Sequence, residues 1–485
     1  MTHSHVRHED KVISLDIGST FTKAALFNVG PETLVLEKMA MVPTNPASLP
    51  DSVYQVLKCF GCLEVNNQKP SYPVYFSSSA KGGLYIIAVG IVPNMTLKAA
   101  RITAMSAGAK VTQAYEYKLT LDNIRQIQQL CPDIILLCGG TDGGNETHIR
   151  HNAGLLAGLQ IRPEIIYAGN KVMRDEVSAI LSQFSLYYAD NILPELDHIS
   201  PDSARQTIQD VFLKHIITGK GLGDIVQLAS REPLPTPLAV MELVEAISSH
   251  RTDWSDFCVI DMGGATTDFY SCCEGYPGEG GVLYRGLMEP RIKRTVEGEL
   301  GMRINAASVL LAGSGILQNM KNTDELMAIQ DYAYKVMDQT SYVPDNPVEK
   351  SYDRMIADIC ITQAAERHVG YRKRIFTGSG ESFIQTGKDL RSVSKIVFTG
   401  GFLSQCADEG LAMLIASRWK QPRQSKSEYI YLYPQKYSIY QDKSYLIPLL
   451  GNLVRDYPIQ VVHTAINSLT DLPIPTKNTM ENIWS

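Results

Sequence analysis

The stretch Val12-Ile-Ser-Leu-Asp16-Ile-Gly-Ser-Thr-Phe-Thr-Lys23-Ala-Ala-Leu-Phe27 decides the fold class of this chain. Two apolar, strand-forming runs flank a short glycine-containing turn, and this pattern predicts a β-hairpin with an aspartate at the end of its first strand. The stretch Phe257-Cys-Val-Ile-Asp261-Met-Gly-Gly-Ala-Thr-Thr-Asp-Phe-Tyr270 repeats the same order of residue types. An internal duplication, with each half opening on one hairpin, is therefore predicted.

The two aspartates, Asp16 and Asp261, are the candidate catalytic and metal-binding residues. Each follows an apolar strand, and removing a lone carboxylate from water costs several kcal/mol unless it is paired. A hydrated Mg²⁺ is a suitable partner, because Mg²⁺ prefers oxygen ligands and retains most of its waters. One of the two carboxylates could also orient or deprotonate an attacking water. Lys23 adds a cation that could neutralise charge on a transferring phosphate.

The turn residues are candidates for holding the phosphate chain of a nucleotide. Glycine lets backbone N–H groups approach an anion closely, and neighbouring hydroxyl groups donate further hydrogen bonds. The candidate residues of the two hairpins are Gly18, Ser19, Thr20, Thr22, Gly263, Gly264, Thr266 and Thr267. Two such hairpins facing each other would bind a magnesium–triphosphate between them.

A third glycine turn follows the strand Lys395-Ile-Val-Phe398 and precedes a predicted helix. Gly400 and Gly401 in this turn would let the base and ribose of a nucleoside lie against the backbone. The expected ligands are therefore ATP and Mg²⁺.

The rest of the chain gives the predicted domain boundaries. From about residue 132, strands alternate with helices, which indicates a parallel sheet. We expect an inserted α/β subdomain at 78–200, a first domain at 11–77 and 201–250, and a second domain at 254–470. A charged helix is expected over 291–303, where Glu297 is a loose candidate for a ribose contact. A helix is expected to start at Asp51, and exposed loops with short strands are expected over 421–445.

Composition excludes several functional classes. The chain has 485 residues and a net charge of −6 without a long basic run, so no nucleic-acid footprint is expected. Its longest apolar run, near 84–93, is about half of the roughly 20 residues needed to span a bilayer. Nine scattered cysteines indicate reduced thiols and a cytoplasmic location.

The order of the Asp16 hairpin, the Asp261 hairpin and Gly400-Gly401 resembles the phosphate 1, phosphate 2 and adenosine motifs of the actin, Hsp70 and sugar-kinase superfamily. This resemblance implies an α/β fold with duplicated RNase-H-like domains, a nucleotide cleft between them, and closure coupled to hydrolysis. A narrower resemblance, to the glutamate mutase accessory proteins, is carried by the segments at 77–84, 89–93, 138–145 and 259–268.

The narrower resemblance implies an ATP-dependent, chaperone-like reactivating factor for an adenosylcobalamin-dependent mutase, with the mutase subunits as partners. Domain movement driven by ATP would let intact cofactor replace damaged cofactor. Two alternatives remain open from the residues. A small-molecule kinase would need a further carboxylate as base for the acceptor hydroxyl. A binding module would hold nucleotide without turnover. The identity of the mutase and the role of the Gly-rich loop 138–145 are not determined by the sequence.

Overall fold

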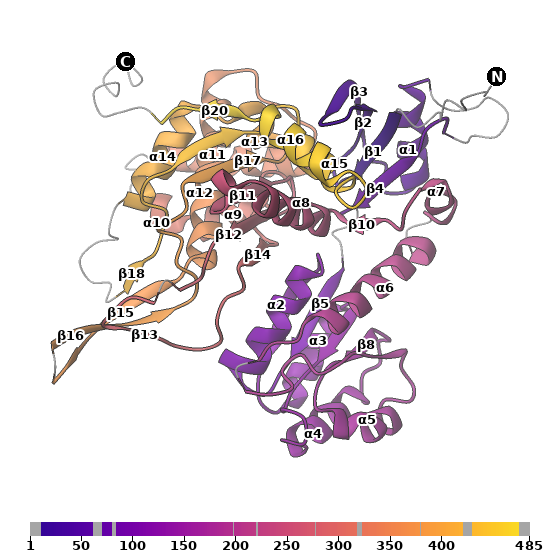
Figure 1. Cartoon of the computed structure of the whole chain (residues 1–485), viewed down its shortest axis with the longest axis vertical. Helices are drawn as coiled ribbons and strands as arrows, with labels where there is room; N and C mark the ends of the chain where they lie inside the picture. Colours follow the sequence, from indigo (N-terminus) through magenta and orange to yellow (C-terminus); the bar gives the residue numbers. More distant parts are fainter. Residues whose placement is uncertain are drawn as a thin grey trace, which may run out of the picture. The chain divides into compact units, whose positions relative to one another are not determined.

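The computed structural model describes residues 11–61, 70–79, 84–196, 198–219, 222–276, 278–317, 323–378, 380–420 and 429–474 (Figure 1). The chain forms two compact units. The first comprises Met1–Ala80, Asp224–Arg285 and Glu289–Ser485, and the second comprises Lys81–Gly223 and Gly286–Met288. The segment expected as an insertion, 78–200, lies almost wholly in the second unit, which continues to Gly223.

The first sheet of the first unit contains the N-terminal hairpin. Its strand order is β10-β4-β1-β2-β3. The pairs β1–β2 and β2–β3 are antiparallel, whereas β4 runs parallel to both β1 and β10. The strands are β1 (Lys11–Ile17), β2 (Phe21–Val29), β3 (Leu34–Pro43), β4 (Val74–Ser78) and β10 (Leu234–Pro235).

The second sheet of the first unit repeats this arrangement. Its order is β14-β12-β11-β17-β19-β20. The pairs β11–β12 and β12–β14 are antiparallel, and β17 runs parallel to β11 and β19. The strands are β11 (Phe257–Met262), β12 (Thr267–Cys272), β14 (Ile292–Glu297), β17 (Lys395–Thr399), β19 (Ser438–Gln441) and β20 (Thr470–Leu472).

Three antiparallel strands followed by two parallel ones thus occur twice, and in each copy the hairpin strand is central. This is the RNase-H-like arrangement, so the predicted fold class, a duplicated α/β fold, is confirmed.

One apolar core joins the two halves of the first unit. It contains side chains from the strands of both sheets, such as Phe27 and Phe257, together with three helices that pack against one another. These helices are α8 (Thr236–His250), α15 (Leu446–Gly451) and α16 (Pro458–Ser468). Burial of apolar side chains from both halves in one cluster holds the two halves together on this side.

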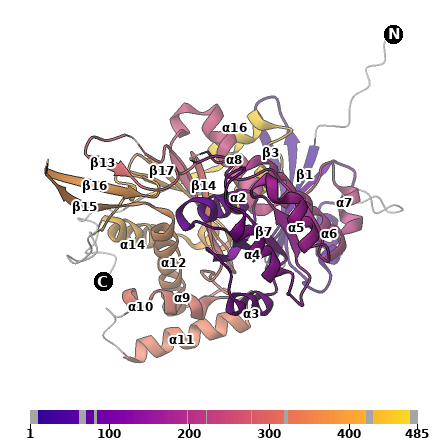
Figure 2. The ribbon, with the colours of Figure 1, turned by 90° about the horizontal axis from the view of Figure 1, so that it is seen from below.

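A second core lies in the C-terminal half, where α12 (Pro347–His368) packs against β12 and β14. Helices α9 (Ala306–Ala312) and α14 (Glu409–Lys420) lie beside α12 (Figure 2). The remaining helices of this unit are α1 (Leu49–Lys58), α7 (Gly223–Leu228), α10 (Ser314–Leu317), α11 (Thr323–Asp338) and α13 (Gly401–Cys406), with the short turn η4 (Thr252–Trp254). A third sheet, ordered β13-β16-β15-β18, contains β13 (Val282–Tyr284), β15 (Tyr371–Thr377), β16 (Gly380–Thr386) and β18 (Tyr429–Tyr431).

The second unit is a doubly wound α/β fold with a five-stranded, fully parallel sheet ordered β6-β5-β7-β8-β9. Its strands are β5 (Tyr85–Val89), β6 (Lys110–Tyr115), β7 (Ile134–Leu137), β8 (Glu164–Tyr167) and β9 (Leu186–Tyr188). Its helices are η2 (Pro93–Leu97), α2 (Lys98–Ser106), α3 (Leu121–Leu130), α4 (Thr147–Leu156), η3 (Lys171–Met173), α5 (Arg174–Ile180) and α6 (Asp202–Gly219). No helix in the described ranges of the chain is both long and apolar enough to span a membrane.

Three local predictions differ from the structure, two of them only in part. The segment 291–303 contains strand β14 (Ile292–Glu297) and no helix, because the residues of this strand pair with β12. Helix α1 begins at Leu49 with Ser48 as its N-cap, so Asp51 lies in the first turn. The segment 421–445 contains the expected short strands, β18 and β19, but its described part is not wholly exposed, because Ile439 and Asp442 are fully buried.

Candidate nucleotide site

The tips of the two hairpins have the same backbone geometry. In the first, the Gly18 N–H donates to the carbonyl oxygen of Phe21 at 3.1 Å, and in the second the Gly263 N–H donates to that of Thr266 at 2.9 Å. A Cβ at residue 18 would lie only 2.8 Å from the Phe21 oxygen, so this turn requires glycine. The similarity of the two halves therefore includes the hydrogen bond that closes each hairpin turn.

The two tips also lie against each other. A Cβ built on Gly264 would be 3.0 Å from the hydroxyl oxygen of Thr20, which places the second turn in contact with the first. The Thr20 hydroxyl makes no hydrogen bond to any residue that the structure describes. The hairpins thus meet as the sequence suggested, and they leave a hydroxyl group at their junction.

Asp16 is held rigidly beneath the first tip. It is 1% exposed, and its two carboxylate oxygens accept hydrogen bonds from the Thr236 hydroxyl at 2.7 Å and the Tyr445 hydroxyl at 2.9 Å. Thr236 opens helix α8, and Tyr445 precedes helix α15. A carboxylate whose two oxygens accept hydrogen bonds from two neutral donors has a defined orientation.

Asp261 is less tightly held. No donor among the described residues hydrogen-bonds to its carboxylate, although burial and the nearby carboxylate of Asp268 raise its pKa to about 7. The third motif borders it directly. A Cβ on Gly400 would lie 2.7 Å from the Asp261 Oδ1 and 2.3 Å from the carbonyl oxygen of Met262. Gly400 is therefore needed for packing against β11, whereas the neighbouring Gly401 has open space around it.

Lys23 is the cation of this cluster. It is 8% exposed, and its ammonium nitrogen lies 3.0 Å from the centre of the Tyr445 ring. Burial lowers its pKa, while the carboxylates of Asp16, Asp261 and Asp442 oppose that change by stabilising the charged form. The charge of Lys23 is thus shared among three carboxylates.

The second hairpin differs from the first at one position. Lys23 lies opposite Asp16, whereas Asp268 lies opposite Asp261. The buried guanidinium of Arg294, on β14, pairs with Asp268 at 2.6 Å. The second half therefore supplies its cation from the neighbouring strand.

Replacing Arg294 with methionine is expected to destabilise the protein by about 3–5 kcal/mol, because the Asp268 carboxylate would remain buried without its cation. Urea unfolding measures this loss. The double variant Arg294→Met/Asp268→Asn should recover most of the stability, since no unpaired charge remains. A double variant as unstable as the single one would contradict this account of the pair.

Asp442 is a site residue that sequence reasoning missed. Its carboxylate accepts hydrogen bonds from the Thr399 hydroxyl at 2.8 Å and from the backbone N–H groups of Leu446 and Ile447. Burial raises its pKa. An aspartate directly after strand β19 repeats the signal that identified Asp16 and Asp261, but the strand was not recognised in this Tyr-rich segment. Thr236 and Tyr445 carried no comparable signal.

Not every predicted hydroxyl faces a common space. The Thr22 hydroxyl bonds to that of Thr44, and the buried Thr267 hydroxyl donates to the carbonyl oxygen of Leu300. Ser19 donates to the carbonyl oxygen of Ser79, and Thr266 to the carboxylate of Asp268. The hydroxyl groups of Thr22 and Thr267 therefore stabilise the hairpins internally. That the turn residues bind phosphate stays a prediction.

The carboxylate groups of this cluster are suitable ligands for a hydrated divalent cation. Asp268 is neutralised by Arg294, which leaves Asp16, Asp261 and Asp442 facing the single ammonium group of Lys23. The described residues contain no cluster of three His, Cys, Asp or Glu side chains arranged to enclose a metal. Mg²⁺ does not need such a cage, because it binds through one or two carboxylates, waters and substrate phosphates.

The raised pKa of Asp261 predicts a pH-dependent stability of the nucleotide-free protein. The folded state holds a proton on Asp261 up to about pH 7, whereas the unfolded chain loses it near pH 4, so stability falls as the pH rises through this range. Urea unfolding between pH 5 and pH 8 measures this. Asp261→Asn should flatten the pH dependence and be more stable than the wild type at about pH 8. An unchanged pH profile in the variant would contradict the assignment.

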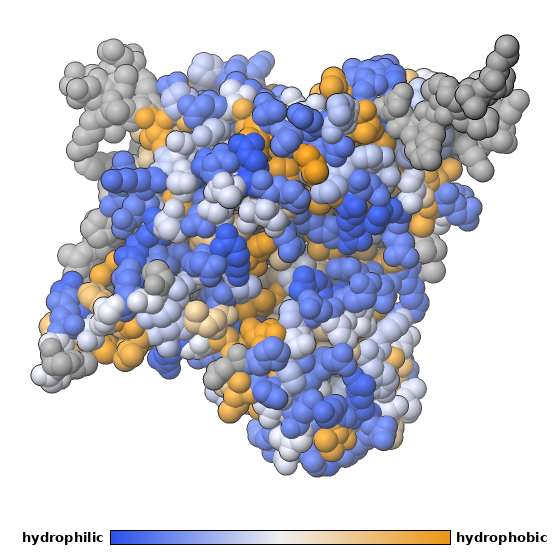
Figure 3. All heavy atoms as spheres, in the orientation of Figure 1, coloured by the Kyte–Doolittle hydropathy of each residue, from blue (hydrophilic) through white to orange (hydrophobic). Residues whose placement is uncertain are grey.

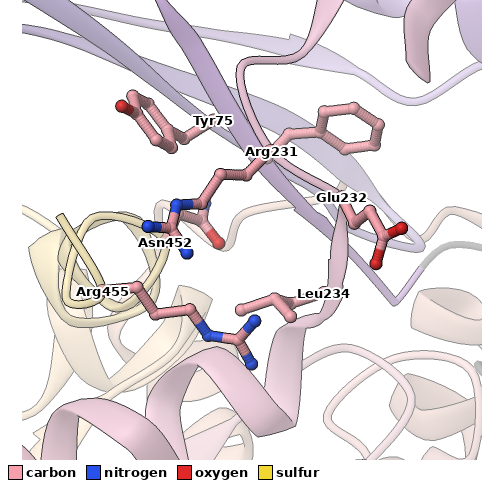
Figure 4. A pocket seen from close by; sticks show the side chains of 7 residues that line it. Tyr75, Arg231, Glu232, Leu234, Asn452 and Arg455 are labelled. Atoms are coloured by element: carbon pink, nitrogen blue, oxygen red, sulfur yellow. The ribbon is translucent and has the colours of Figure 1, made fainter. Parts of the chain in front are cut away.

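A pocket lies next to strand β4, which contributes Tyr75 and Phe76, and next to β10, which contributes Leu234 (Figure 4). Its two guanidinium groups are already paired, Arg231 with Asp456 and Arg455 with Glu242. Asn452 at its wall donates to the carbonyl oxygen of Leu15 at 2.7 Å. Asn452 therefore supports strand β1, and the two arginines of the pocket offer no unpaired cation for an anionic ligand.

The Gly-rich loop 138–145 lies in the second unit. Gly139 and Gly140 have positive φ angles, and a Cβ on Gly139 would lie 2.6 Å from the side chain of Ile91. The Asn170 side chain accepts a hydrogen bond from the Gly143 N–H at 2.9 Å. The composition of this loop is explained by packing within the subdomain.

Two RNase-H-like halves whose acidic hairpins meet define a protein of the actin, Hsp70 and sugar-kinase fold class. The chain belongs to the MutL protein family, whose model matches residues 12–469. It is 35% identical over 471 residues to the protein MutL of Clostridium tetanomorphum, covering 93% of this chain and 98% of that protein. The family resemblance inferred from the motifs is therefore confirmed.

Several solved structures are similar to this chain at low TM-scores. Gluconate kinase from Lactobacillus acidophilus has a TM-score of 0.34 and 12% identity, covering 96% of this chain and 94% of that one. A glycerol dehydratase reactivase has a TM-score of 0.32 and 9% identity, covering 92% and 99%. Component A of the Acidaminococcus fermentans (R)-2-hydroxyglutaryl-CoA dehydratase has a TM-score of 0.29 and 10% identity, covering 92% and 97%. Scores this low carry no argument, and the fold assignment rests on strand order and register.

Proposed function

We propose that this protein is an ATPase that acts as a chaperone-like reactivating factor for an adenosylcobalamin-dependent mutase of the glutamate mutase type. The observation that carries the ATPase part is the meeting of the two hairpin tips above Asp16, Asp261 and Lys23. Membership of the MutL family and the motif resemblance to glutamate mutase accessory proteins support the mutase part.

The chain's own residues would divide the work as follows. Mg²⁺, when bound, would neutralise charge on the phosphates of ATP. Asp16 and Asp261 would hold the hydrated cation, and the backbone N–H groups at the tips would bind phosphate oxygens. Asp261 has no donor among the described residues and a pKa near neutrality, so its carboxylate is suited to accept a proton from an attacking water. Lys23 would balance developing negative charge.

The duplicated fold supports a coupling of ATP turnover to movement. Thr20 and Gly264 belong to different halves, so a phosphate chain at their junction would be held from both sides. Loss of the terminal phosphate would remove part of the attraction between the halves. In this proposal the resulting movement acts on the subunits of the mutase, in the cytoplasm, and allows damaged cobalamin to leave.

The test has two independent readouts. Purified protein with Mg²⁺ and ATP should release phosphate without any added acceptor, and it should restore activity to a glutamate mutase inactivated during turnover when intact cofactor is supplied. Phosphate release that requires a small-molecule acceptor would contradict the ATPase assignment and favour a kinase. Phosphate release without reactivation would contradict the mutase assignment alone.

A further inference from the structure

Strand β3 forms an unusually long and apolar edge of the first sheet. It spans ten residues and lies at the end of the strand order, next to β2 alone. Four of its apolar side chains are exposed: Val35 by 56%, Leu36 by 36%, Met39 by 36% and Met41 by 56%. Figure 3 shows apolar side chains at the surface around the place that β3 occupies in Figure 1. A long apolar edge strand is a template for pairing with another strand.

The backbone of β3 is available along most of this edge. At Leu34, both the N–H and the carbonyl oxygen are bonded to the Thr464 hydroxyl of helix α16. From residue 35 to residue 43, no backbone group is bonded to a described residue outside β2. Every second residue of an edge strand directs its N–H and carbonyl outward, so β3 offers several unpaired groups.

The faces of β3 follow from its register with β2. Leu36, Met39 and Met41 lie opposite Phe27, Ala25 and Lys23, which alternate along β2, so the three apolar side chains share one face of the sheet. Leu26 pairs with Lys38 and Phe27 with Leu36, which makes Glu37 the extra residue of a β-bulge.

The two charged residues of β3 lie on the opposite face. Lys38 is opposite Leu26. Glu37 pairs with Lys11 at 2.6 Å, and Lys11 is opposite Asn28, which shares the face of Leu26. Glu37 and Lys38 therefore lie next to each other at the middle of the strand, on the same face and with opposite charges.

We propose that β3 pairs antiparallel with β3 of a second copy of this chain, about a two-fold axis between Glu37 and Lys38. In this register Glu37 of each copy lies opposite Lys38 of the other, and Leu36 lies opposite Met39 on the other face. A two-fold interface makes every contact twice, so one dimer contains two Glu–Lys pairs and two Leu–Met pairs.

Charge selects this register over its neighbours. An axis through residue 38 would place the two lysines opposite each other, and an axis through residue 37 would do the same with the glutamates. An axis between Lys38 and Met39 would place both charges opposite apolar or small residues. Of these four registers, only the one about residues 37 and 38 places opposite charges against each other and apolar side chains against each other. This complementarity of β3 with itself identifies a second copy of the chain as the partner strand.

The experiment measures the mass of the full-length protein in solution, by sedimentation or light scattering, up to about 100 µM. The wild type should be a dimer. Glu37→Lys and Lys38→Glu should each raise the dimer dissociation constant at least about tenfold, because two attractive pairs become repulsive. Lys58→Glu, at an exposed position on α1, is the matched control and should leave the dimer unchanged.

A mixing experiment separates lost pairing from misfolding. When the Glu37→Lys and Lys38→Glu proteins are combined, lysines of one chain face glutamates of the other, so a mixed dimer should form. The double variant Glu37→Lys/Lys38→Glu should also dimerise. A monomeric wild type, single variants that stay dimeric, or a mixture that stays monomeric would each overturn the proposal.

Discussion

Asp16→Asn is expected to lower the rate of ATP hydrolysis by about 10²–10⁴-fold, the range typical for losing a positioned carboxylate at a reacting centre. The substitution preserves the shape of the side chain and removes its negative charge. Both Asp16 oxygens accept hydrogen bonds, from Thr236 and Tyr445, so an asparagine amide nitrogen would face one of these hydroxyl groups. Phosphate release at saturating Mg²⁺ and ATP measures the effect.

Asp51→Asn is the matched control, because Asp51 is exposed on helix α1 of the same half. It should retain the wild-type rate. Urea unfolding should show that the Asp16→Asn protein is still folded. Hydrolysis at the wild-type rate in folded Asp16→Asn would show that this carboxylate has no part in turnover.

Gly400→Ala is expected to destabilise the protein by about 3 kcal/mol or more and to weaken nucleotide binding. The residue has a φ of 98°, which costs a non-glycine residue of order 1–3 kcal/mol. The added Cβ would also lie 2.3 Å from the Met262 carbonyl oxygen and 2.7 Å from the Asp261 carboxylate. Relief of this clash requires β11 to shift, and Asp261 would shift with it.

The neighbouring glycine provides the control. Gly401 has nothing within 4 Å of its Cβ position and is the first residue of helix α13, so Gly401→Ala should be close to neutral in stability. Urea unfolding and equilibrium nucleotide binding of both variants make the comparison. Equal effects of the two substitutions would contradict the close packing described for Gly400.

The sequence was informative where residues with a clear chemical role occur in a recognisable secondary-structure pattern. An apolar strand, an aspartate and a glycine turn occur together twice, and this combination predicted both hairpins, their repetition and the family. Strand β14 was mistaken for a helix because the segment 291–303 is rich in charged residues, among them Arg294, which the structure buries. Its burial depends on Asp268, which lies 26 residues away in the chain, and no local pattern reports that pairing.

The supporting residues of the site were harder to predict for the same reason. Thr236 and Tyr445 reach Asp16 across 220 and 429 positions, and both lie at helix starts whose placement depends on the shared core of the two halves. Asp442 had a local signal, an aspartate after an apolar strand, but the strand is short and the surrounding segment is rich in tyrosine. Packing in the folded protein brings these distant segments together, and a single sequence does not show which segments pack against each other.

The central claim is that Asp16 and Asp261, from different halves, act on one bound magnesium–nucleotide. A double-mutant cycle on the dissociation constant of Mg·ATP tests it most directly, with Asp16→Asn, Asp261→Asn and the combined variant. The account predicts that each single variant weakens binding and that the combined variant loses clearly less than the sum of the two free-energy changes. Strictly additive losses, or unchanged binding in either single variant, would contradict a shared site.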